Sequence, residues 1–328
     1  MDKNEITVSI CCITYNQRNY IKDAIEGFLK QKTSFKYEVI VHDDASTDGT
    51  TEIIREYANK YPDIIKPIFE SENQYSKGVK RILNITYKKA RGKYIALCEG
   101  DDFWTDDEKL QLQVEYMEKN KTCTFCFHNA TIFNLFNQEK RPFIPYSRTL
   151  KKYMKKDGNY NVGELELLEF IPTASFIFRK EYLYKMPDFY NECFVGDWPT
   201  KLIMTSFGYA HYIDRDMCTY RMNSIGSITA KNNKDSSENL NNKIKILNEK
   251  IKLMKNINEF TQEKYKDVFN MRISQFEIEK LLEQKKNNEI KEKEYLDNIK
   301  GTLKFKYILK IYFPKLFNLC KNIVKRGE

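Results

Sequence analysis

The first hundred residues alternate between two kinds of apolar pattern. Short runs rich in Val, Ile and Tyr, such as ITVSICCI at 6–13, are typical of buried β-strands. Between them lie segments with apolar residues at helical spacing, such as Ile21, Ile25 and Phe28. Alternating strands and helices predict an α/β fold with a mostly parallel sheet and helices on both faces. We expect strands at 6–13, 37–43, 64–70 and 93–98 and helices at 19–31, 46–61 and 77–90.

Polar residues follow these predicted strands directly. Asn16 comes after the first strand, Asp43 and Asp44 close the second, and Glu99–Asp102 follow the fourth. Ligands of parallel α/β sheets bind at the carboxyl ends of the strands. We therefore expect these side chains to share one rim of the sheet and to form the functional site.

The stretch CEGDDFW crowds Glu99, Asp101 and Asp102 into four positions, and these carboxylates repel one another without a cation among them. Neither G-x-G-x-x-G nor G-x-x-x-x-G-K-[ST] follows the first strand, so a glycine-rich phosphate loop is not expected. Carboxylates at a strand end suit Mg²⁺ or Mn²⁺ bridging the protein to a substrate diphosphate. The sequence predicts such a metal, held by Asp101 or Asp102 together with a nucleotide.

The segments VSICCITYNQRNYIKDAIEGFLKQ, EVIVHDDASTDGTTEIIREYA and GKYIALCEGDDFWTDDEKLQLQ follow one another in this order. Together they resemble the family 2 glycosyltransferases, inverting enzymes of the GT-A fold that use nucleotide-diphosphate sugars. The resemblance covers residues 6–230. It implies a Rossmann-like sheet, a UDP-sugar donor, and an acceptor that is a cell-surface glycan, a lipid-linked saccharide or a protein.

The resemblance also implies roles for single residues. Tyr15 is expected to stack on the base and Asp44, or else Asp43, to bind the uracil edge. Asn16, Arg81 and Asp101 complete the expected donor contacts, and Asp101 or Asp102 is expected on the metal. Glu99 occupies a position where the family often has Asp, so whether the Glu99 side chain contacts the ligand stays an open question at this point. An alternative for Asp44 and Ser46 is to cap the helix expected near Thr47.

Inverting transfer needs a base for the acceptor hydroxyl, and the candidate is Asp197 in CFVGDWPTKLIMTSFGYAHYI. The family usually carries an acidic pair before this helix, but Gly196 takes the place of the Glu, so the assignment rests on Asp197 alone. The alternative role of Asp197 is to cap the helix. Arg221 is a candidate phosphate contact, with a salt bridge to Asp214 or Asp216 as its alternative.

The chain is expected to contain a catalytic domain at 1–230, with a donor half at 1–105 and an acceptor half at 106–230. Residues 231–328 are rich in Lys, Asn and Glu and carry helical apolar stripes, with a break near Thr261, which predicts a helical appendage. The appendage offers a surface for a homodimer. Its basic amphipathic tail, with Leu316, Leu319, Ile323 and Val324 on one face, is expected to bind either an anionic membrane or protein.

The distribution of charge and the positions of the cysteines give expectations about binding partners and cellular location. The net charge of +9 is concentrated in the tail rather than on a folded face with stacking aromatics, so a nucleic-acid partner is not expected. The eight cysteines lie mostly in apolar runs without the spacing of a disulfide framework, which predicts a cytoplasmic location. Peripheral binding to the inner face of the plasma membrane is compatible with that location.

Two other classes of function compete with a transferase. One is a catalytically silent GT-A-like module that binds a nucleotide sugar or acts as a scaffold, and the retained acidic residues argue against it. The other is a nucleotidyltransferase, which usually carries a Gly-rich basic loop where this chain has TYNQRNY.

Overall fold

The fold is given by a computed structural model that describes residues 5–144, 153–154, 156–225, 240–286, 289–290, 294–314 and 317, without the side chains of 79–81 and 294. The chain divides into two compact units, Met1–Asn232 and Asn233–Glu328. The described part of the first unit contains a sheet with helices, and that of the second is helical.

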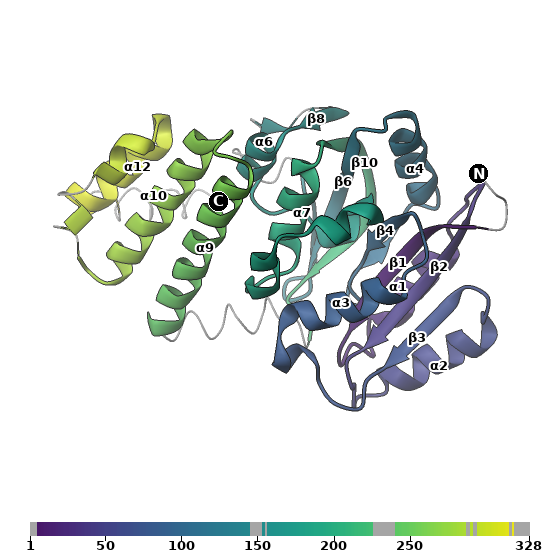
Figure 1. Cartoon of the computed structure of the whole chain (residues 1–328). Helices are drawn as coiled ribbons and strands as arrows, with labels where there is room; N and C mark the ends of the chain where they lie inside the picture. Colours follow the sequence, from purple (N-terminus) through teal and green to yellow (C-terminus); the bar gives the residue numbers. More distant parts are fainter. Residues whose placement is uncertain are drawn as a thin grey trace. The chain divides into compact units, whose positions relative to one another are not determined.

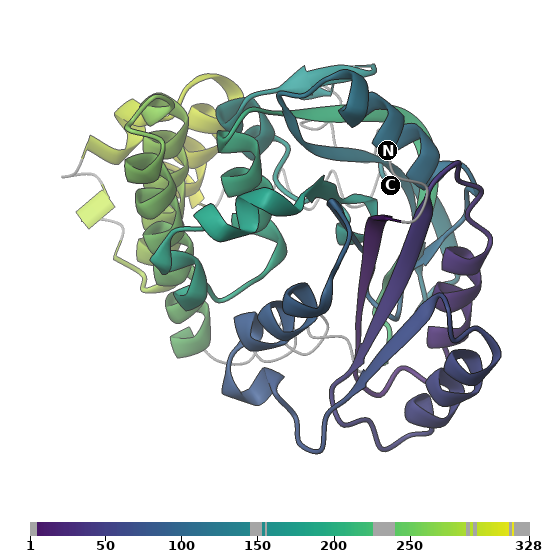
Figure 2. The same cartoon turned by 45° about the vertical axis from the view of Figure 1, so that its right-hand side comes forward.

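The beginning of the first unit alternates as its apolar patterns predict. Four strands pair in parallel in the order β3-β2-β1-β4, with Thr14 opposite Asp43 at the carboxyl ends of β1 and β2. Figure 2 shows α1 and α2 on one face of these strands and α3 on the other. The bounds are β1 Ile6–Thr14, α1 Ile21–Leu29, β2 Lys36–Asp43, α2 Thr50–Lys60, β3 Ile65–Phe69, α3 Val79–Lys89 and β4 Tyr94–Leu97.

The rest of the first unit extends the same sheet. Among the described residues the strand order continues from β4 through β9, β6 and β10 to β5, while β7 pairs with β6 and β8 with β10. The elements are β5 Phe103–Trp104, α4 Lys109–Lys119, β6 Cys123–Asn134, β7 Glu139–Pro142, β8 Gly158–Tyr160, α6 Val162–Leu167, β9 Ile177–Arg179, α7 Asp197–Ser206 and β10 Tyr209–Met222.

The α/β class is confirmed, but parallel pairing covers only part of the sheet. Strands β6 and β10 pair in parallel, whereas the three-residue β9 lies antiparallel between β4 and β6. Strands β5, β7 and β8 are antiparallel to their neighbours as well. Antiparallel strands can arrive through short connections that need no crossover helix, so the strand–helix alternation could not reveal them.

The core of the first unit lies on both faces of the sheet. Every residue of β4 is buried, as are Val8, Ile10, Val39 and Val41 of the neighbouring strands. Residues 123–128 of β6 are also buried on both faces, since β6 lies inside the sheet. Burial of these central strands leaves the loops at their carboxyl ends as the place where polar side chains gather.

The described part of the second unit contains three long helices, α9 Leu240–Phe260, α10 Lys266–Glu283 and α12 Gly301–Tyr312, besides a short 3-10 helix at Glu294–Asn298. They lie side by side in Figure 1. Helix α9 ends at Phe260 and α10 begins at Lys266, which confirms the break expected near Thr261. Ile278 and Leu281 of α10 pack with Tyr307 and Ile311 of α12 in one apolar cluster.

The predicted amphipathic face of Leu316, Leu319, Ile323 and Val324 lies outside the described residues. Within the described part of the chain, no helix is both long enough and apolar enough to span a bilayer.

Candidate functional site

Three loops meet at the carboxyl ends of β1, β2 and β4. The backbone N–H of Asp44 donates to the carbonyl of Thr14 at 3.0 Å, and the N–H of Gly100 donates to the carbonyl of Ile13 at 2.9 Å. These bonds continue the parallel ladder past the last residues of the strands. The expectation that the polar residues after these strands share one rim is confirmed.

The loop after β1 is fastened to the loop after β2 through Asn16. Its backbone N–H donates to Ser46 Oγ at 2.9 Å, and its Oδ1 accepts from the N–H of Thr47 at 2.8 Å. Asn16 adopts φ 51°, a left-handed conformation that Asn tolerates better than most residues. The neighbouring Tyr15 remains 40% exposed. Asn16 thus positions the loop, and the ring of Tyr15 is accessible for stacking.

Asp44 is buried and already engaged by the backbone. Its Oδ1 accepts from the N–H of Gln74 at 2.6 Å, and its Oδ2 accepts from the N–H of Tyr75 at 3.1 Å. Asp43 accepts from the N–H of Ser46 and from the hydroxyl of Thr51. A uracil edge could reach Asp44 only by replacing the segment at 74–75 or by binding beside it.

The alternative role of Asp44 and Ser46 as helix caps is wrong. Helix α2 begins at Thr50 and its N-cap is Gly49 in a left-handed conformation. The side chain that accepts from the N–H of Thr50 is that of Asp48, at 3.0 Å. The helix starts later than expected because Asp48 first accepts from the backbone N–H of Arg18, which ties this turn to the β1 loop.

The carboxylates after β4 lie close enough to raise one another's pKa. Glu99 is reached by solvent, yet the protein around it removes much of its hydration. This desolvation, followed by the charges of Asp101 and Asp197, raises the pKa of Glu99 from 4.5 to about 8. Burial also raises the pKa of Asp101, and burial with the charges of Asp101 and Glu99 holds the pKa of Asp102 well above its usual range. The cluster has more negative charge than its surroundings neutralise.

The two neighbouring aspartates differ in their hydrogen bonds. Asp101 Oδ2 accepts from the hydroxyl of Ser224 at 2.5 Å, and Asp102 Oδ1 accepts from the backbone N–H of Arg221 at 2.8 Å. Asp102 Oδ2 is buried and has no hydrogen-bond partner among the described residues. An unpaired buried carboxylate oxygen is costly, and a divalent cation would relieve that cost.

The donor set therefore fits a hard cation that takes some of its ligands from a substrate. No group of three or more His, Cys, Asp or Glu side chains suited to a metal occurs in the described part of the chain. Mg²⁺ commonly uses only one or two carboxylates and completes its shell with phosphate oxygens and water. Asp101 and Asp102 supply that kind of partial shell.

Arg221 links the loop of residues 99–102, called the carboxylate loop below, to helix α1. Its guanidinium donates to the carbonyl of Asp101 at 2.9 Å, pairs with Asp23, and lies 4.4 Å from the ring centroid of Phe103. The alternative salt bridge to Asp214 or Asp216 is wrong. The partner is Asp23 of α1, nearly two hundred residues away in the chain, which no local pattern indicates.

Asp197 lies near this cluster, at the first residue of α7. Gly196 is the N-cap and no side chain caps the helix, so the alternative capping role of Asp197 is wrong. The half-buried Asp197 carboxylate has no hydrogen bond or ion pair among the described residues, and its charge raises the pKa of Glu99. The structure thus brings Asp197 and the β4 loop together from positions about a hundred residues apart.

The structure does not describe the side chain of Arg81, which belongs to α3. It adds Tyr75 and Ser224 to the residues at the site: the charge of Glu99 adds to burial in raising the pKa of Tyr75, and Ser224 binds Asp101. Tyr75 lies in a segment without a motif of its own. Glu99, whose role the sequence left open, lies near enough to Asp101 and Asp197 for their charges to add to burial in raising its pKa.

A separate cavity of about 500 Å³ lies behind the carboxylate loop, at Trp104 and the end of α1. Lys30, Lys32 and Arg215 line it together with Asp106 and Asp107, and Lys32 and Arg215 are paired with those acidic residues. None of the four carboxylates of the candidate site lines this cavity. The chemistry of the strand-end cluster, and not the size of this cavity, identifies the site.

Comparison with known proteins agrees with the geometry. The family model "Glycosyl transferase family 2" matches residues 9–186, just over half of the chain. Protein Rv1520 of Mycobacterium tuberculosis is 36% identical over 219 residues, which are 67% of this chain and 60% of that protein. The Escherichia coli enzyme WfgD, a UDP-Glc:alpha-D-GlcNAc-diphosphoundecaprenol beta-1,3-glucosyltransferase, is 30% identical over 47% of this chain and 58% of its own length. The chain thus spans about 60% of the length of the curated relatives it matches first.

Solved structures share the fold at low sequence identity. TarS 1-349 of S. aureus in complex with UDP-GlcNAc has a TM-score of 0.56 and 15% identity, over 93% of this chain and 82% of that one. The mannosyltransferase PcManGT of Pyrobaculum calidifontis in complex with GDP-Man and Mn²⁺ has a TM-score of 0.55 and 14% identity, over 98% and 86%. These likenesses support the GT-A fold. With the family match, they lead to one assignment: this chain belongs to glycosyl transferase family 2.

Proposed function

We propose that the protein transfers a sugar from a UDP-sugar to a hydroxyl group of a glycan, lipid-linked or protein acceptor, with inversion at the anomeric carbon. The observation that carries the proposal is the approach of Asp197 to the Glu99–Asp102 cluster at the strand ends. One place then holds carboxylates for a cation-bound diphosphate and a further carboxylate for a proton. The UDP-sugar in the printed name of WfgD and the UDP-GlcNAc in the TarS structure support this choice of donor.

The donor is held by the loops after β1 and β2 in this proposal. The accessible ring of Tyr15 stacks on the base, and Asn16 keeps the loop in place through Ser46 and Thr47. Asp44 binds the uracil edge, which requires the backbone N–H groups of Gln74 and Tyr75 to yield. Arg81 is retained as a predicted donor contact. Arg221 acts mainly by fixing the Asp101 carbonyl, and its contact with phosphate stays a prediction.

Asp101 and Asp102 are the residues that would hold Mn²⁺ or Mg²⁺. When bound, the cation stabilises the negative charge that develops on the departing nucleoside diphosphate. The PcManGT structure contains Mn²⁺, which supports a divalent ion in this fold. Ser224 binds Asp101 in the structure, so this hydroxyl competes with a cation for Asp101 Oδ2.

Asp197 acts as the general base. Its carboxylate lacks a hydrogen bond or ion pair among the described residues and is half-buried, so it is able to accept the proton of an acceptor hydroxyl. The oxygen of that hydroxyl attacks the anomeric carbon as the bond to the diphosphate breaks on the opposite face.

Product analysis separates this proposal from its two rivals. The full chain is incubated with a panel of UDP-sugars and Mn²⁺, and free UDP and pyrophosphate are quantified. We expect UDP release, and its loss in Asp101→Asn. In a second incubation, UTP and a sugar phosphate replace the UDP-sugar, and release of pyrophosphate there would assign a nucleotidyltransferase. Binding of UDP-sugar without turnover on any acceptor class would assign a silent binding module.

The remaining predicted partners concern the second unit. Peripheral association with an anionic membrane fits a lipid-linked acceptor, such as the diphosphoundecaprenol compound in the name of WfgD, and is part of the proposal. A cytoplasmic location and a homodimer through the C-terminal helices stay predictions from the sequence.

A further inference from the structure

Helix α12 has two faces of different character. Tyr307 and Ile311 are buried against α10, and Leu303 packs beside them. These residues recur every four positions and define the inner face of the helix. The orientation of α12 within the second unit is therefore set, and its opposite face points away from this apolar cluster.

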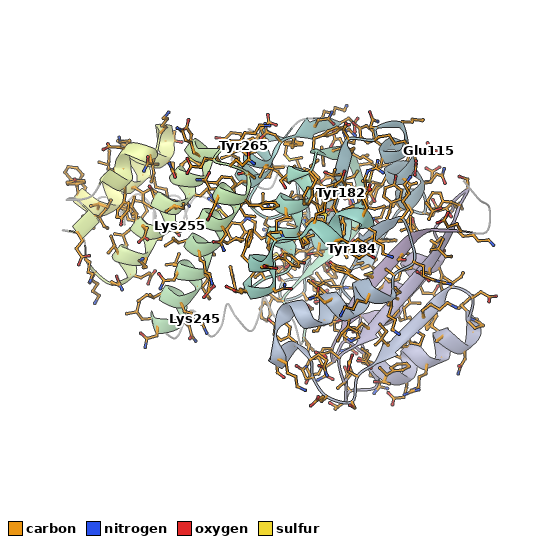
Figure 3. The ribbon with its side chains drawn as sticks, in the orientation of Figure 1. Glu115, Tyr182, Tyr184, Lys245, Lys255 and Tyr265 are labelled. Carbon is orange, nitrogen blue, oxygen red and sulfur yellow. The ribbon has the colours of Figure 1, made fainter. Side chains whose placement is uncertain are left out.

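The outer face carries large exposed aromatic side chains. Phe305 is 63% exposed, Tyr312 45% and Phe313, which follows the last residue of the helix, 55%. Phe305 and Tyr312 are seven residues apart, two helical turns, so they lie on the same side. Other strongly exposed aromatics occur singly in the first unit: Phe136 between β6 and β7, and Tyr184, which Figure 3 labels.

Positive charge accompanies these aromatic side chains. Lys306 is exposed and Lys310 is partly exposed, and neither forms an ion pair among the described residues. From Gly301 to the end, the sequence contains seven Lys or Arg and one Glu. Lys306 neighbours Phe305 on the exposed side of the helix, whereas Lys310 lies toward the flank of the inner face. We call the group Phe305, Lys306, Tyr312 and Phe313 the aromatic–basic face.

We propose that the aromatic–basic face binds the surface of a membrane rich in anionic phospholipid. Aromatic side chains enter the headgroup region and lysines pair with anionic headgroups, which is how interfacial helices bind. The proposal deepens the proposed function, since it would place the enzyme where a lipid-linked acceptor lies. A second copy is the less favourable occupant. A symmetric contact through this face would bring two segments of net charge +6 together.

Vesicle flotation with the full chain tests this proposal. The probes are phosphatidylcholine vesicles and vesicles of phosphatidylcholine mixed with phosphatidylglycerol. We expect the protein to float with the anionic vesicles alone and to release at about 0.5 M NaCl, where the Debye length is only a few Å. Phe305→Ser with Phe313→Ser should weaken binding at least about tenfold, because two aromatic side chains no longer enter the interface. Phe136→Ser, which removes a still more exposed ring in the first unit, is the control and should float like the wild type.

Two outcomes would overturn the proposal. One is equal flotation of the double variant and the wild type, and the other is failure of the wild type to bind anionic vesicles. In the second case, light scattering that shows a dimer lost in the double variant assigns the face to a second copy. Asp101→Asn should float normally, so a failure of flotation and a failure of the proposed catalysis are distinguishable. Melting temperatures of all variants verify that they are folded.

Discussion

Asp197 illustrates how the position of a carboxylate decides between two roles that the sequence leaves open. An acidic residue before a helix commonly caps it, and a sequence cannot say which residue is the cap. In the structure Gly196 takes the cap position, and Asp197 lies one residue further on, near Glu99. That single-residue offset leaves the carboxylate available for proton transfer.

Asp197→Asn is expected to lower turnover by at least about 10²-fold, the usual size of a general-base contribution. Donor affinity should stay the same, since the base acts on the acceptor. Stability should change little, because an acidic residue in a first helical turn contributes about 0.3–1 kcal/mol. Rate, UDP affinity and melting temperature are measured on one preparation. Asp267→Asn, in the first turn of α10, is the control and should keep the full rate.

Arg221→Lys is expected to destabilise the fold by about 1–3 kcal/mol, because lysine cannot both pair with Asp23 and donate to the Asp101 carbonyl. Arg215→Lys is the control, since Arg215 pairs with Asp106 and Glu108 at a more exposed position, and should cost about 0.5 kcal/mol or less. Denaturant titration measures both. Equal losses of stability in the two variants would contradict the role of Arg221 in holding the loop of residues 99–102.

The acidic residues of the site could be predicted individually, but their partners could not. Position after an apolar run identifies Asp44 and Asp101, because strand ends can be recognised from hydrophobic pattern. The backbone groups that bind Asp44 at 74–75, and the pairing of Asp23 with Arg221, depend on tertiary contacts between distant segments. A single sequence carries no signal for those contacts.

At the scale of elements, the site depends on three loops that pack closely at Gly100. A Cβ at this position would lie 2.5 Å from Gln17 Oε1 and 2.8 Å from Thr14 Oγ1, and these two atoms are themselves hydrogen bonded. Gly100 therefore permits the β4 loop to approach the β1 loop. Larger residues would push the carboxylates away from the rim.

Gly100→Ala is expected to cost about 1–3 kcal/mol of stability through overpacking and to abolish activity at temperatures where the protein stays folded. Turnover and thermal unfolding are compared with those of the wild type. Retention of both would mean that the β1 and β4 loops are looser than the structure shows.

The contact between β10, β8 and α4 makes stability depend on pH. His211 is buried, stacks on Tyr116 and bonds through Nδ1 to Asn159 at 2.7 Å, and burial lowers its pKa to about 4. The unfolded chain, with a histidine pKa near 6.5, binds the proton more readily. Stability is thus complete above about pH 6.5 and falls as the pH drops toward 4.

His211→Gln should flatten this dependence, since glutamine keeps a donor for Asn159 but does not titrate. The wild type is expected to lose on the order of 2 kcal/mol from this group between pH 7.5 and 5. Urea titrations at the two pH values test it. If the variant loses as much free energy of unfolding between pH 7.5 and pH 5 as the wild type does, other groups cause the loss.

The strands of the first half could be predicted from their apolar runs, whereas the order of the second half could not. Strand β9 contributes only three residues and enters between β4 and β6 from a later part of the chain. Its place is decided by the open edge of β4 and by packing of residues such as Phe176 against Phe125. Such pairings arise only once the sheet is assembled.

At the scale of the whole molecule, the family match and the local geometry give different information. The match identifies the class of enzyme, and the geometry shows which side chains lie together. The family match covers residues 9–186 and stops before Asp197, so the predicted base lies outside the matched segment. The spatial approach of Asp197 to the β4 loop therefore supplies what the match does not. The sugar and the acceptor depend on contacts that a comparison at this level of identity does not specify.

The central claim is that Asp101 and Asp102 bind a nucleoside diphosphate through a divalent cation. Titration calorimetry of the full chain with UDP, in Mn²⁺ and in EDTA, tests it most directly. UDP is expected to bind at least about tenfold more weakly in EDTA, and Asp101→Asn is expected to remove the difference, because the cation would join carboxylate and diphosphate. An equal UDP affinity with and without the metal would contradict it.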